Sequence, residues 1–488
     1  NSAPIYVQAA KNAILVLPDG TTNTITDGDS YTFEDSTTDE ANATIFSKDD
    51  LTIRGNGTLT VNANYNNGIT SKDDLKITGG NITITSADDG LMGKDSITIK
   101  GGNITINASG DGLKSTNSEE TEKGYIDIQG GTLNITSTND GIQAESNVNI
   151  SDGTINITTG GGSANSSSKN NNDQNPWGQW GNSSSSSSST STDTSSAKAI
   201  KAVNTITIDG GTFTIDSSDD SIHSNNSIVI NGGTIDISSG DDGIHSDTTL
   251  DINGGDINIS KSYEGIESTT ININGGNIHL VASDDGINAS GGNDSSSTSG
   301  RPGQNNFSSG NGQINFNGGY VYIDVSGDGI DANGSIELND GTVIVNGPQD
   351  NGNGALDYDS TFNINGGLLI AAGSSGMAQN PSTSSTQNSI NVYVNGTANS
   401  LLTIKAESGE EIISFAPSKS YQSVIISSPE LETGKTYSAY YGGTSTGTST
   451  DGLYTDGTTS GGTEITSFTL SSTVSNVSQS GVKIGRAS

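Results

Sequence analysis

A seven-residue motif recurs along this chain and sets the strongest limit on its fold. The motif reads Asp-Leu-Lys-Ile-Thr-Gly-Gly at residues 74–80, Ser-Ile-Thr-Ile-Lys-Gly-Gly at 96–102 and Ser-Ile-Val-Ile-Asn-Gly-Gly at 227–233. Equivalent positions such as Asp89 and Asp111 are separated by 22 residues, which gives the length of the repeating unit. Self-similarity at this period indicates a solenoid, in which each repeat packs against the repeats before and after it.

Within one unit the apolar residues form two alternating pairs and a single position, for example Ile97 and Ile99, Ile104 and Ile106, and then Leu113. Such alternation is the pattern of a β-strand with one buried face. The Gly-Gly and Asp-Gly pairs between the alternating segments permit the positive φ angles of tight corners. Three short strands and three corners per coil predict an all-β, right-handed parallel β-helix with about 22 residues per coil.

Three other solenoids have related repeats, and the sequence argues against each of them. A leucine-rich repeat requires leucine at fixed spacings and often a helical half, whereas each unit here has Ile-x-Ile pairs and no helix-forming stretch. A calcium-binding nonapeptide roll requires Gly-Gly-x-Gly-x-Asp, and a left-handed hexapeptide helix requires a six-residue period. Neither pattern is present.

The composition is polar for a chain of 488 residues, because only 29% of the residues are hydrophobic. Disorder is the first interpretation of such a composition, but the strict alternation of the apolar residues contradicts it. The chain has 55 acidic and 19 basic side chains, and its formal charge of -36 disfavours nucleic acid and anionic membrane surfaces and favours cations as partners. No apolar run approaches the roughly 20 residues that span a bilayer, so no membrane insertion is expected.

We expect a secreted protein that is extracellular or associated with the cell surface. The chain starts at Asn1 without a methionine, as it would after removal of a signal peptide, and it is rich in Ser, Thr, Asn and Gly. The absence of cysteine fits several compartments and does not decide between them.

The repeat also predicts the domain organisation. It is clear between about Ala43 and Ala372, is interrupted by tracts that read as loops, and gives way to other strand-like segments at both ends. The expected parts are an N-terminal cap strand region (1–42), the β-helix (43–372) with loop insertions at 160–196 and 290–312, a linker (373–389), and a C-terminal β cap or small domain with a Ser/Thr/Gly-rich tail (390–488).

One corner of the repeat carries an acidic residue in almost every copy, as in Asp-Asp-Gly-Leu at 88–91 and Asp-Asp-Gly-Ile at 241–244. Equivalent positions of a solenoid lie one coil apart, so these side chains should form a column. Unit charges about 4.8 Å apart repel by about 3 kcal/mol at an effective dielectric constant of about 20, and a column of them requires a cation. Ca²⁺ accepts about six to eight oxygen ligands in loose geometry, whereas Mg²⁺ requires a stricter octahedron. The candidate calcium ligands are Asp88, Asp89, Asp111, Asp140, Asp219, Asp220, Asp241, Asp242, Glu264, Glu267, Asp284, Asp285, Asp328 and Asp331.

Some of these carboxylates are stronger candidates, because a second acidic residue follows the Gly-Ile of the same corner. They are Asp328 and Asp331 with Asp285, and Glu264 and Glu267 with Asp242. The competing interpretation is turn chemistry alone, which would predict an indifferent mixture of Asp and Asn. An earlier acidic column, with Lys-Asp-Asp at 48–50 and 72–74 and Lys-Asp-Ser at 94–96, is either neutralised by its own lysines or bound to calcium.

The three histidines raise the question of zinc. His223 and His245 lie one coil apart, but His279 lies in a different strand and the chain has no cysteine, so a closed zinc site is not expected. We expect these imidazoles to be exposed or to flank ligands.

At the repeated Asp-Asp-Gly-Ile corner the chain resembles pectate-lyase-like parallel β-helices, and more closely the secreted carbohydrate-binding β-helix proteins of clostridia. The resemblance covers roughly residues 5 to 440. It implies calcium binding, recognition of plant polysaccharides such as polygalacturonate and cellulose, and no established catalysis. In calcium-dependent pectate lyases of this shape an Asp-Asp-Gly-Ile-Asp corner holds the ion and a nearby Lys or Arg removes the proton. Here Gly327 replaces the first Asp at 327–331, and the expected base is missing.

We therefore expect a non-catalytic polysaccharide-binding protein in which calcium bridges to an anionic polymer. The candidate carbohydrate-binding residues are Trp177, Trp180, Lys261 and Arg301. Two alternatives remain open. One is a lyase with Lys261 as its base; the other is a calcium-stabilised surface fibre in which solenoid ends add head to tail.

Overall fold

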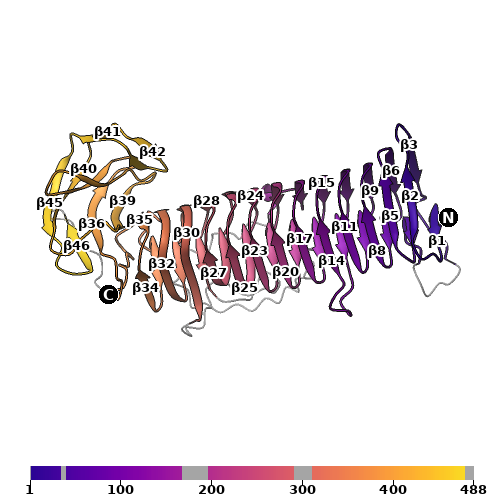
Figure 1. Ribbon diagram of the computed structural model, residues 1–488, viewed down its shortest axis with the longest axis horizontal. Helices are drawn as coiled ribbons and strands as arrows, with labels where there is room; N and C mark the ends of the chain where they lie inside the picture. The colour runs from indigo at the N-terminus through magenta and orange to yellow at the C-terminus, as the bar shows by residue number, and fades with distance from the viewer. Residues whose placement is uncertain (1, 34–39, 167–195, 291–309, 479–488) are drawn as a thin grey trace, which may run out of the picture.

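The computed structural model describes residues 2–33, 40–166, 196–290 and 310–478. These residues form a long rod of stacked coils, with a smaller β domain at its C-terminal end (Figure 1). Trp177, Trp180 and Arg301, and most of the two predicted loop insertions, lie outside the described residues.

Each coil of the rod contributes a strand to each of three parallel faces, and four long strands run around a corner into a second face. Face 1 consists of β1 (Ile5–Val7), β4 (Ala43–Ser47), β7 (Asn67–Ser71), β10 (Leu91–Gly93), β13 (Leu113–Ser115), β16 (Ile142–Ala144), β19 (Ile200–Ala202), β22 (Ile222–Ser224), the first parts of β25 (Ile244–Ile252) and β27 (Ile266–Ile273), β29 (Ile287–Ala289), β31 (Ile330–Ala332) and β33 (Leu356–Tyr358).

Faces 2 and 3 follow in chain order within each coil. Face 2 consists of β2 (Ala13–Leu17), β5 (Leu51–Gly55), β8 (Asp74–Ile77), β11 (Ser96–Ile99), β14 (Tyr125–Ile128), β17 (Asn147–Ile150), β20 (Thr205–Ile208), β23 (Ser227–Ile230), the second parts of β25 and β27, the first parts of β30 (Gly312–Val325) and β32 (Gly334–Asn346), and β34 (Thr361–Ile364). Face 3 consists of β3 (Thr22–Thr26), β6 (Thr58–Ala63), β9 (Asn81–Ser86), β12 (Asn103–Ala108), β15 (Thr132–Ser137), β18 (Thr154–Thr159), β21 (Thr212–Ser217), β24 (Thr234–Ser239), β26 (Asp256–Lys261), β28 (Asn277–Ala282), the second parts of β30 and β32, and β35 (Leu368–Gly373).

The register of these faces confirms the predicted parallel β-helix and its 22-residue coil. On face 1, Leu91 pairs with Ile69 on one side and with Leu113 on the other. Insertions lengthen single coils without disturbing the register, since Ile142 pairs with Ile200 across the described and undescribed residues between them. A slip of one residue would turn every buried isoleucine outward, so the alternation fixes this register.

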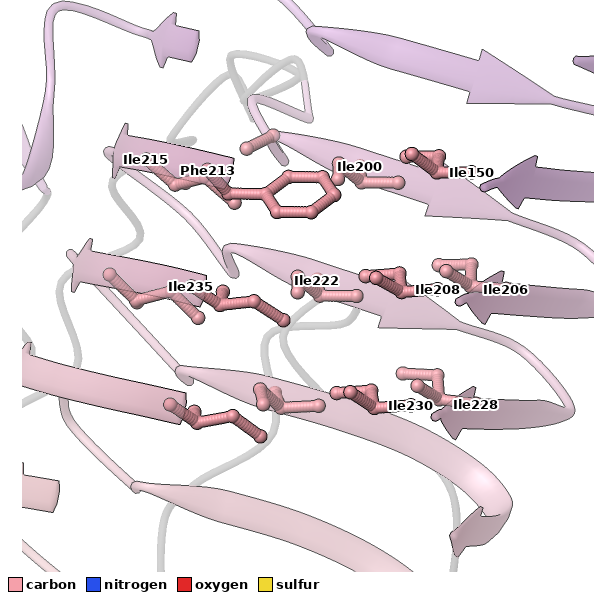
Figure 2. Close-up of a cluster of buried hydrophobic side chains, with 14 of the residues drawn as sticks. Ile150, Ile200, Ile206, Ile208, Phe213, Ile215, Ile222, Ile228, Ile230 and Ile235 are labelled. Carbon is pink, nitrogen blue, oxygen red and sulfur yellow. The ribbon is translucent and has the colours of Figure 1, made fainter. Parts of the chain in front are cut away.

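The core is a set of stacked isoleucines. Ile97, Ile99, Ile104, Ile106 and Leu113, the apolar positions of one predicted unit, are each 0% exposed. Figure 2 shows the same arrangement further along the rod, where Ile206 and Ile208 lie next to Ile228 and Ile230 of the following coil. Each coil thus covers the apolar side chains of its neighbours, which explains how so polar a chain folds.

The glycines of the two corner types serve different purposes. Gly102 of a Gly-Gly corner has φ 109°, as the sequence predicts. At the acidic corner Gly90 is not in the left-handed region; instead, a Cβ there would lie 2.5 Å from Ile106 Cγ2 and 2.7 Å from the Gly112 carbonyl oxygen. Glycine at this position lets successive coils approach closely, so the expectation of positive φ at the Asp-Gly corner was wrong.

The N-terminal end of the rod differs from the expected cap. Strands β1 to β3 pair in parallel with β4 to β6, so residues 5–26 form the first coil of the rod. Their core-facing Ile5, Ala13, Leu15 and Ile25 are only partly buried, because among the described residues no further coil covers them.

The C-terminal end of the rod is covered. Strand β39 (Tyr421–Ser427) pairs antiparallel with β35, and the expected linker runs beside β34, where Ser382 Oγ accepts a hydrogen bond of 2.9 Å from the Phe362 N–H. The other strands of this end are β36 (Ser389–Gly396), β37 (Leu402–Ala406), β38 (Glu411–Phe415), β40 (Thr436–Tyr441), β41 (Thr444–Ser445), β42 (Thr448–Thr450), β43 (Leu453–Thr455), β44 (Thr459–Ser460), β45 (Thr463–Thr469) and β46 (Val474–Ser478).

In the described part of the chain the one helix is η1 (Ser163–Asn165), a short 3-10 turn. No described helix has the length and apolarity needed to cross a membrane.

Candidate functional site

The acidic corner lies between face 3 and face 1, and its carboxylates point into the stack. Asp89, Asp111 and Asp140 are 3–5% exposed. Asp89 Oδ1 accepts a hydrogen bond of 2.9 Å from the Asp111 N–H, Asp111 Oδ1 accepts one of 2.9 Å from the Asp140 N–H, and Asp140 Oδ1 accepts one of 2.8 Å from the Lys198 N–H. Each carboxylate therefore satisfies a buried backbone donor of the next coil, a structural task that accounts for one of its two oxygens.

The same ladder continues toward the C-terminus. Asp220 accepts from the Asp242 N–H at 3.1 Å, Asp242 from the Glu264 N–H at 3.2 Å, and Asp285 from the Asp328 N–H at 2.6 Å. The predicted column of acidic residues exists, and these carboxylates accept hydrogen bonds from the backbone N–H groups of the next coil.

In the first half of the column, lysines neutralise the carboxylates. Lys114 Nζ lies 2.6 Å from Asp111 and 3.7 Å from Asp89, and Lys201 Nζ lies 3.3 Å from Asp140. These carboxylates already have a cation, so the electrostatic argument that assigned calcium to them does not apply.

Lys198 is the residue that sequence reasoning missed. It occupies the column position itself, and its buried Nζ lies 2.5 Å from Asp220 and 3.1 Å from Asp219. Burial acts against both charges, but Lys198 and His223 hold the pKa of Asp220 well below its usual range. The signal was present in the sequence, since Lys198-Ala-Ile aligns with Asp-Gly-Ile once the insertion before it is removed.

The two corner histidines are buried, and the expectation of exposed imidazoles was wrong. His223 is 6% exposed and its Nδ1 lies 2.9 Å from Asp220 Oδ2, while His245 is 1% exposed between Asp242 and Glu267. Burial lowers the pKa of His245, but the three carboxylates around it, Asp242, Asp220 and Glu267, outweigh burial and raise the pKa to about 10.

The last coils of the column differ from the first, because among the described residues no Lys, Arg or His forms an ion pair with Asp285, Asp328, Asp331 or Asp357. Burial and repulsion from Asp284 and Asp328 raise the pKa of Asp285 to about 8. Burial and repulsion from Asp357 raise the pKa of Asp331 to about 7. In the part of the chain that the structure describes, no basic side chain neutralises these four carboxylates.

Asp331 and Asp357 are register neighbours on face 1, one coil apart. Asp328 uses Oδ1 to accept a hydrogen bond of 2.5 Å from the Gly354 N–H, which leaves Oδ2 for another partner. Gly327, which replaces the first Asp of the lyase corner, has a structural reason: a Cβ there would lie 2.4 Å from Asp285 Oδ1 and 2.6 Å from Asp284 Oδ1.

Three groups of His, Asp and Glu in the described residues bring ligand atoms within 4.8 Å of one another. They are Asp220, His223 and His245; Asp242, His245 and Glu267; and Asp219, Asp220 and Asp241. Asp328 and Asp331 are not in such a group, and Glu264 turns aside to accept a hydrogen bond of 2.9 Å from Asn288 Nδ2. The three residues predicted to share a calcium ion, Asp242, Glu264 and Glu267, therefore do not form one group, because the His245 imidazole lies between Asp242 and Glu267.

Several other predicted residues have partners of their own. Asp88 Oδ2 accepts a hydrogen bond of 3.1 Å from Asn66. Lys261 Nζ donates a hydrogen bond of 2.5 Å to the Ser163 carbonyl, so the residue proposed as the base in the lyase alternative already has a partner. In the early acidic column Asp95 pairs at 2.8 Å with Lys123, which lies outside the Lys-Asp motifs, and Lys48 of the first motif pairs with Glu40 at 2.6 Å.

The fold places this chain among the parallel β-helix proteins, with one ladder of inward carboxylates along a corner. Residues 1–243 match the model of a family described as "Carbohydrate-binding domain-containing protein". A curated protein of Acetivibrio thermocellus with the same description is 57% identical over 83 residues, which are 17% of this chain and 29% of that protein. These two matches confirm the predicted resemblance to carbohydrate-binding β-helix proteins.

A solved structure is also similar in sequence, the polysaccharide lyase-like protein from C. thermocellum in its gadolinium derivative. It is 49% identical, and the match covers 33% of this chain and 64% of that one with a TM-score of 0.32. The chain spans less than a third of the length of the curated relative and less than two thirds of the solved chain.

Proposed function

We propose that this chain is an extracellular, non-catalytic polysaccharide-binding β-helix that uses Ca²⁺ at the C-terminal end of its acidic column. The observation that carries the proposal is the contrast within one column. The same corner is neutralised by lysines near Asp111 and Asp220 but has no described cation near Asp328 and Asp331.

The donor chemistry of the last coils suits calcium. Asp328, Asp331 and Asp357 offer carboxylate oxygens only, and Ca²⁺ prefers an all-oxygen set of flexible geometry. Burial and repulsion between carboxylates raise the pKa of Asp331 and Asp285, and a divalent ion would stabilise their charged forms. An ion at such an edge keeps positions open, and carboxylates of an acidic polymer such as polygalacturonate are suitable ligands for them.

Recognition of a polysaccharide rests on the matching family's description. Binding without catalysis rests on the missing base: Lys261 is engaged with the Ser163 carbonyl. β-Elimination requires a positioned base next to the activated carbon, and the corner lysines Lys114 and Lys201 pair with Asp111 and Asp140.

The test is calorimetric titration of metal-free protein with Ca²⁺, followed by binding to polygalacturonate and to cellulose with and without EGTA. Asp331→Asn should weaken Ca²⁺ at least about tenfold, and polygalacturonate binding should fall with it. Asp209→Asn is the matched control, since it also removes one charge and Asp209 serves only as a hydrogen-bond acceptor for Asn231 on the surface.

Absorbance of unsaturated product is recorded in the same samples. Product formation would contradict the non-catalytic assignment, and an absence of Ca²⁺ uptake would contradict the ion. Calcium-dependent fibres in electron micrographs would instead support the fibre alternative.

A further inference from the structure

His245 lies in an unusual setting for a buried imidazole. It is 1% exposed, and its Nδ1 lies 3.5 Å from Asp242 Oδ2 and 3.7 Å from Glu267 Oε2. Nδ1 forms no hydrogen bond in the structure. A buried polar atom without a hydrogen bond is costly, and two carboxylate oxygens face the same space.

The second oxygen of each of the two carboxylates already accepts a hydrogen bond. Asp242 Oδ1 accepts the Glu264 N–H at 3.2 Å, and Glu267 Oε1 accepts a hydrogen bond of 2.6 Å from Ser290 Oγ. His245 Nε2 lies 3.6 Å from Asp247 Oδ1, so a carboxylate stands behind the ring. Outer partners of this kind orient metal ligands and set the tautomer of a ligating histidine.

The neighbouring histidine provides a contrast within the same column. His223 Nδ1 makes a hydrogen bond of 2.9 Å with Asp220 Oδ2, and its Nε2 lies 3.2 Å from Asn225 Oδ1. Asp220 also binds Lys198, so Asp220 and His223 already have partners. Of the two histidine-containing groups in the described residues, the one with an unpartnered ring nitrogen facing two carboxylates is that of His245, Asp242 and Glu267.

We propose that Asp242, His245 and Glu267 form a binding site for a divalent transition-metal ion such as Zn²⁺, with Oδ2, Nδ1 and Oε2 as ligand atoms. These atoms all lie within 4.8 Å of one another. Separations of 3.5 and 3.7 Å are too long for good hydrogen bonds and suit ligands placed about 2.0–2.2 Å from a shared ion.

The ligand set selects the class of ion. One imidazole nitrogen with two carboxylate oxygens suits Zn²⁺, Co²⁺ or Ni²⁺, whereas Ca²⁺ and Mg²⁺ prefer oxygen alone. The side chain of Glu267 is 17% exposed, which gives an ion a route in and leaves a position for water. The site lies earlier in the column than Asp331 and does not depend on the proposed calcium site.

The test uses the full chain, stripped of metal, in buffer with millimolar Ca²⁺, titrated with Zn²⁺ by calorimetry and with Co²⁺ by visible absorption. One Zn²⁺ per chain should bind, and Co²⁺ should give the d–d bands of a nitrogen- and oxygen-ligated ion. His245→Gln and Glu267→Gln should each weaken binding at least about tenfold. His279→Gln is the matched control among the three histidines and should leave binding unchanged.

Thermal melts of each variant identify any loss of fold, and Glu267→Gln, which is nearly isosteric and partly exposed, keeps the test informative if His245→Gln fails to fold. The inference is overturned if Zn²⁺ does not bind, as it would not if His245 serves simply as a protonated counter-ion, or if both variants bind as the wild type does. Asp331→Asn should weaken Ca²⁺ and leave Zn²⁺ unchanged, so failure of one site can be told from failure of the other.

Discussion

At the residue scale, the acidic corner shows that equivalent positions of a repeat have different chemistry. Asp111 and Asp328 stand at equivalent places in their coils, but three residues further on the first corner has Lys114 and the second has Asp331. Lys198 is the sharpest case, because one buried ammonium balances Asp219 and Asp220. A buried ion pair contributes less than its short distance suggests, yet the removal of one partner leaves an uncompensated charge.

Lys198→Gln should therefore destabilise the protein by about 3 to 5 kcal/mol, because Asp220 is then buried without its cation. Urea denaturation measures the change in the free energy of unfolding. The double variant Lys198→Gln with Asp220→Asn should recover much of the loss. Equal stability of the double variant and Lys198→Gln alone would contradict the assignment of this pair.

At the scale of the element, short strands are stable here because each is bounded by corners that allow coils to stack closely. Gly90 of the acidic corner faces Ile106 of the coil's own face 3 and the Gly112 carbonyl of the next coil. The space at this corner has no room for a Cβ, which explains why Gly follows the acidic residue in most copies.

Gly90→Ala should destabilise the rod by about 1 to 3 kcal/mol, since the new Cβ would lie within 2.7 Å of two atoms that cannot easily move. Gly101→Ala is the control, because the nearest atom to its Cβ would be 3.8 Å away. Thermal unfolding followed by circular dichroism compares the two. A similar fall in Tm for both would show that close packing at the acidic corner is not the cause.

A second element-scale contact joins the C-terminal domain to the rod. Asp451, in the turn between β42 and β43, accepts hydrogen bonds at 2.9 Å from His279 Nε2 and at 2.7 Å from the Tyr320 hydroxyl. Lys419 of the same domain pairs with Asp324 at 2.8 Å. The Asp451 contacts tie the hairpin of β42 and β43 to face 3, and the Lys419 ion pair ties the segment before β39 to the same face.

Asp451→Ala should release that hairpin, and amide hydrogen exchange at residues 448–455 should rise about tenfold or more, whereas exchange in the rod should not change. Asp456→Ala is the control, because Asp456 has a similar positive φ of 55° and is exposed. An equal rise in exchange for both variants would indicate backbone strain instead of the lost contact.

At the scale of the whole molecule, the dominant quantity is the negative charge of -36. Burial in the folded rod, together with repulsion from neighbouring carboxylates, raises the pKa of Asp285 to about 8, of Asp331 to about 7 and of Asp328 to about 6. Between the ordinary carboxyl pKa and these values the folded state binds more protons than the unfolded state. Stability must therefore fall as the pH rises through that range.

Metal-free protein should consequently have a Tm about 5 °C or more higher at pH 5 than at pH 8.5. The raised pKa of His245 acts in the same direction, and the lowered pKa of Asp220 acts below this range. Saturating Ca²⁺ should reduce the dependence of Tm on pH, because the bound ion neutralises the carboxylates that otherwise bind protons. Thermal unfolding followed by circular dichroism between pH 5 and pH 8.5 measures this change. A Tm that rises with pH in the absence of metal would contradict the prediction.

The sequence by itself determined the coil, the three strands and the column of acidic residues. The 22-residue period and the strict alternation allow one register, since any slip would expose a row of isoleucines. It also determined that the corner would be acidic, and the family resemblance followed from the same repeats.

Only the tertiary structure decided which carboxylates have partners. Lys198 is far from Asp140 in the sequence but donates its backbone N–H to that carboxylate, because Ile200 pairs in register with Ile142. His245 meets Glu267 only when the next coil is laid beside it. Periodicity specifies the backbone of each coil, but the charge balance at a position depends on side chains from the adjacent coils, and these differ from one repeat to the next.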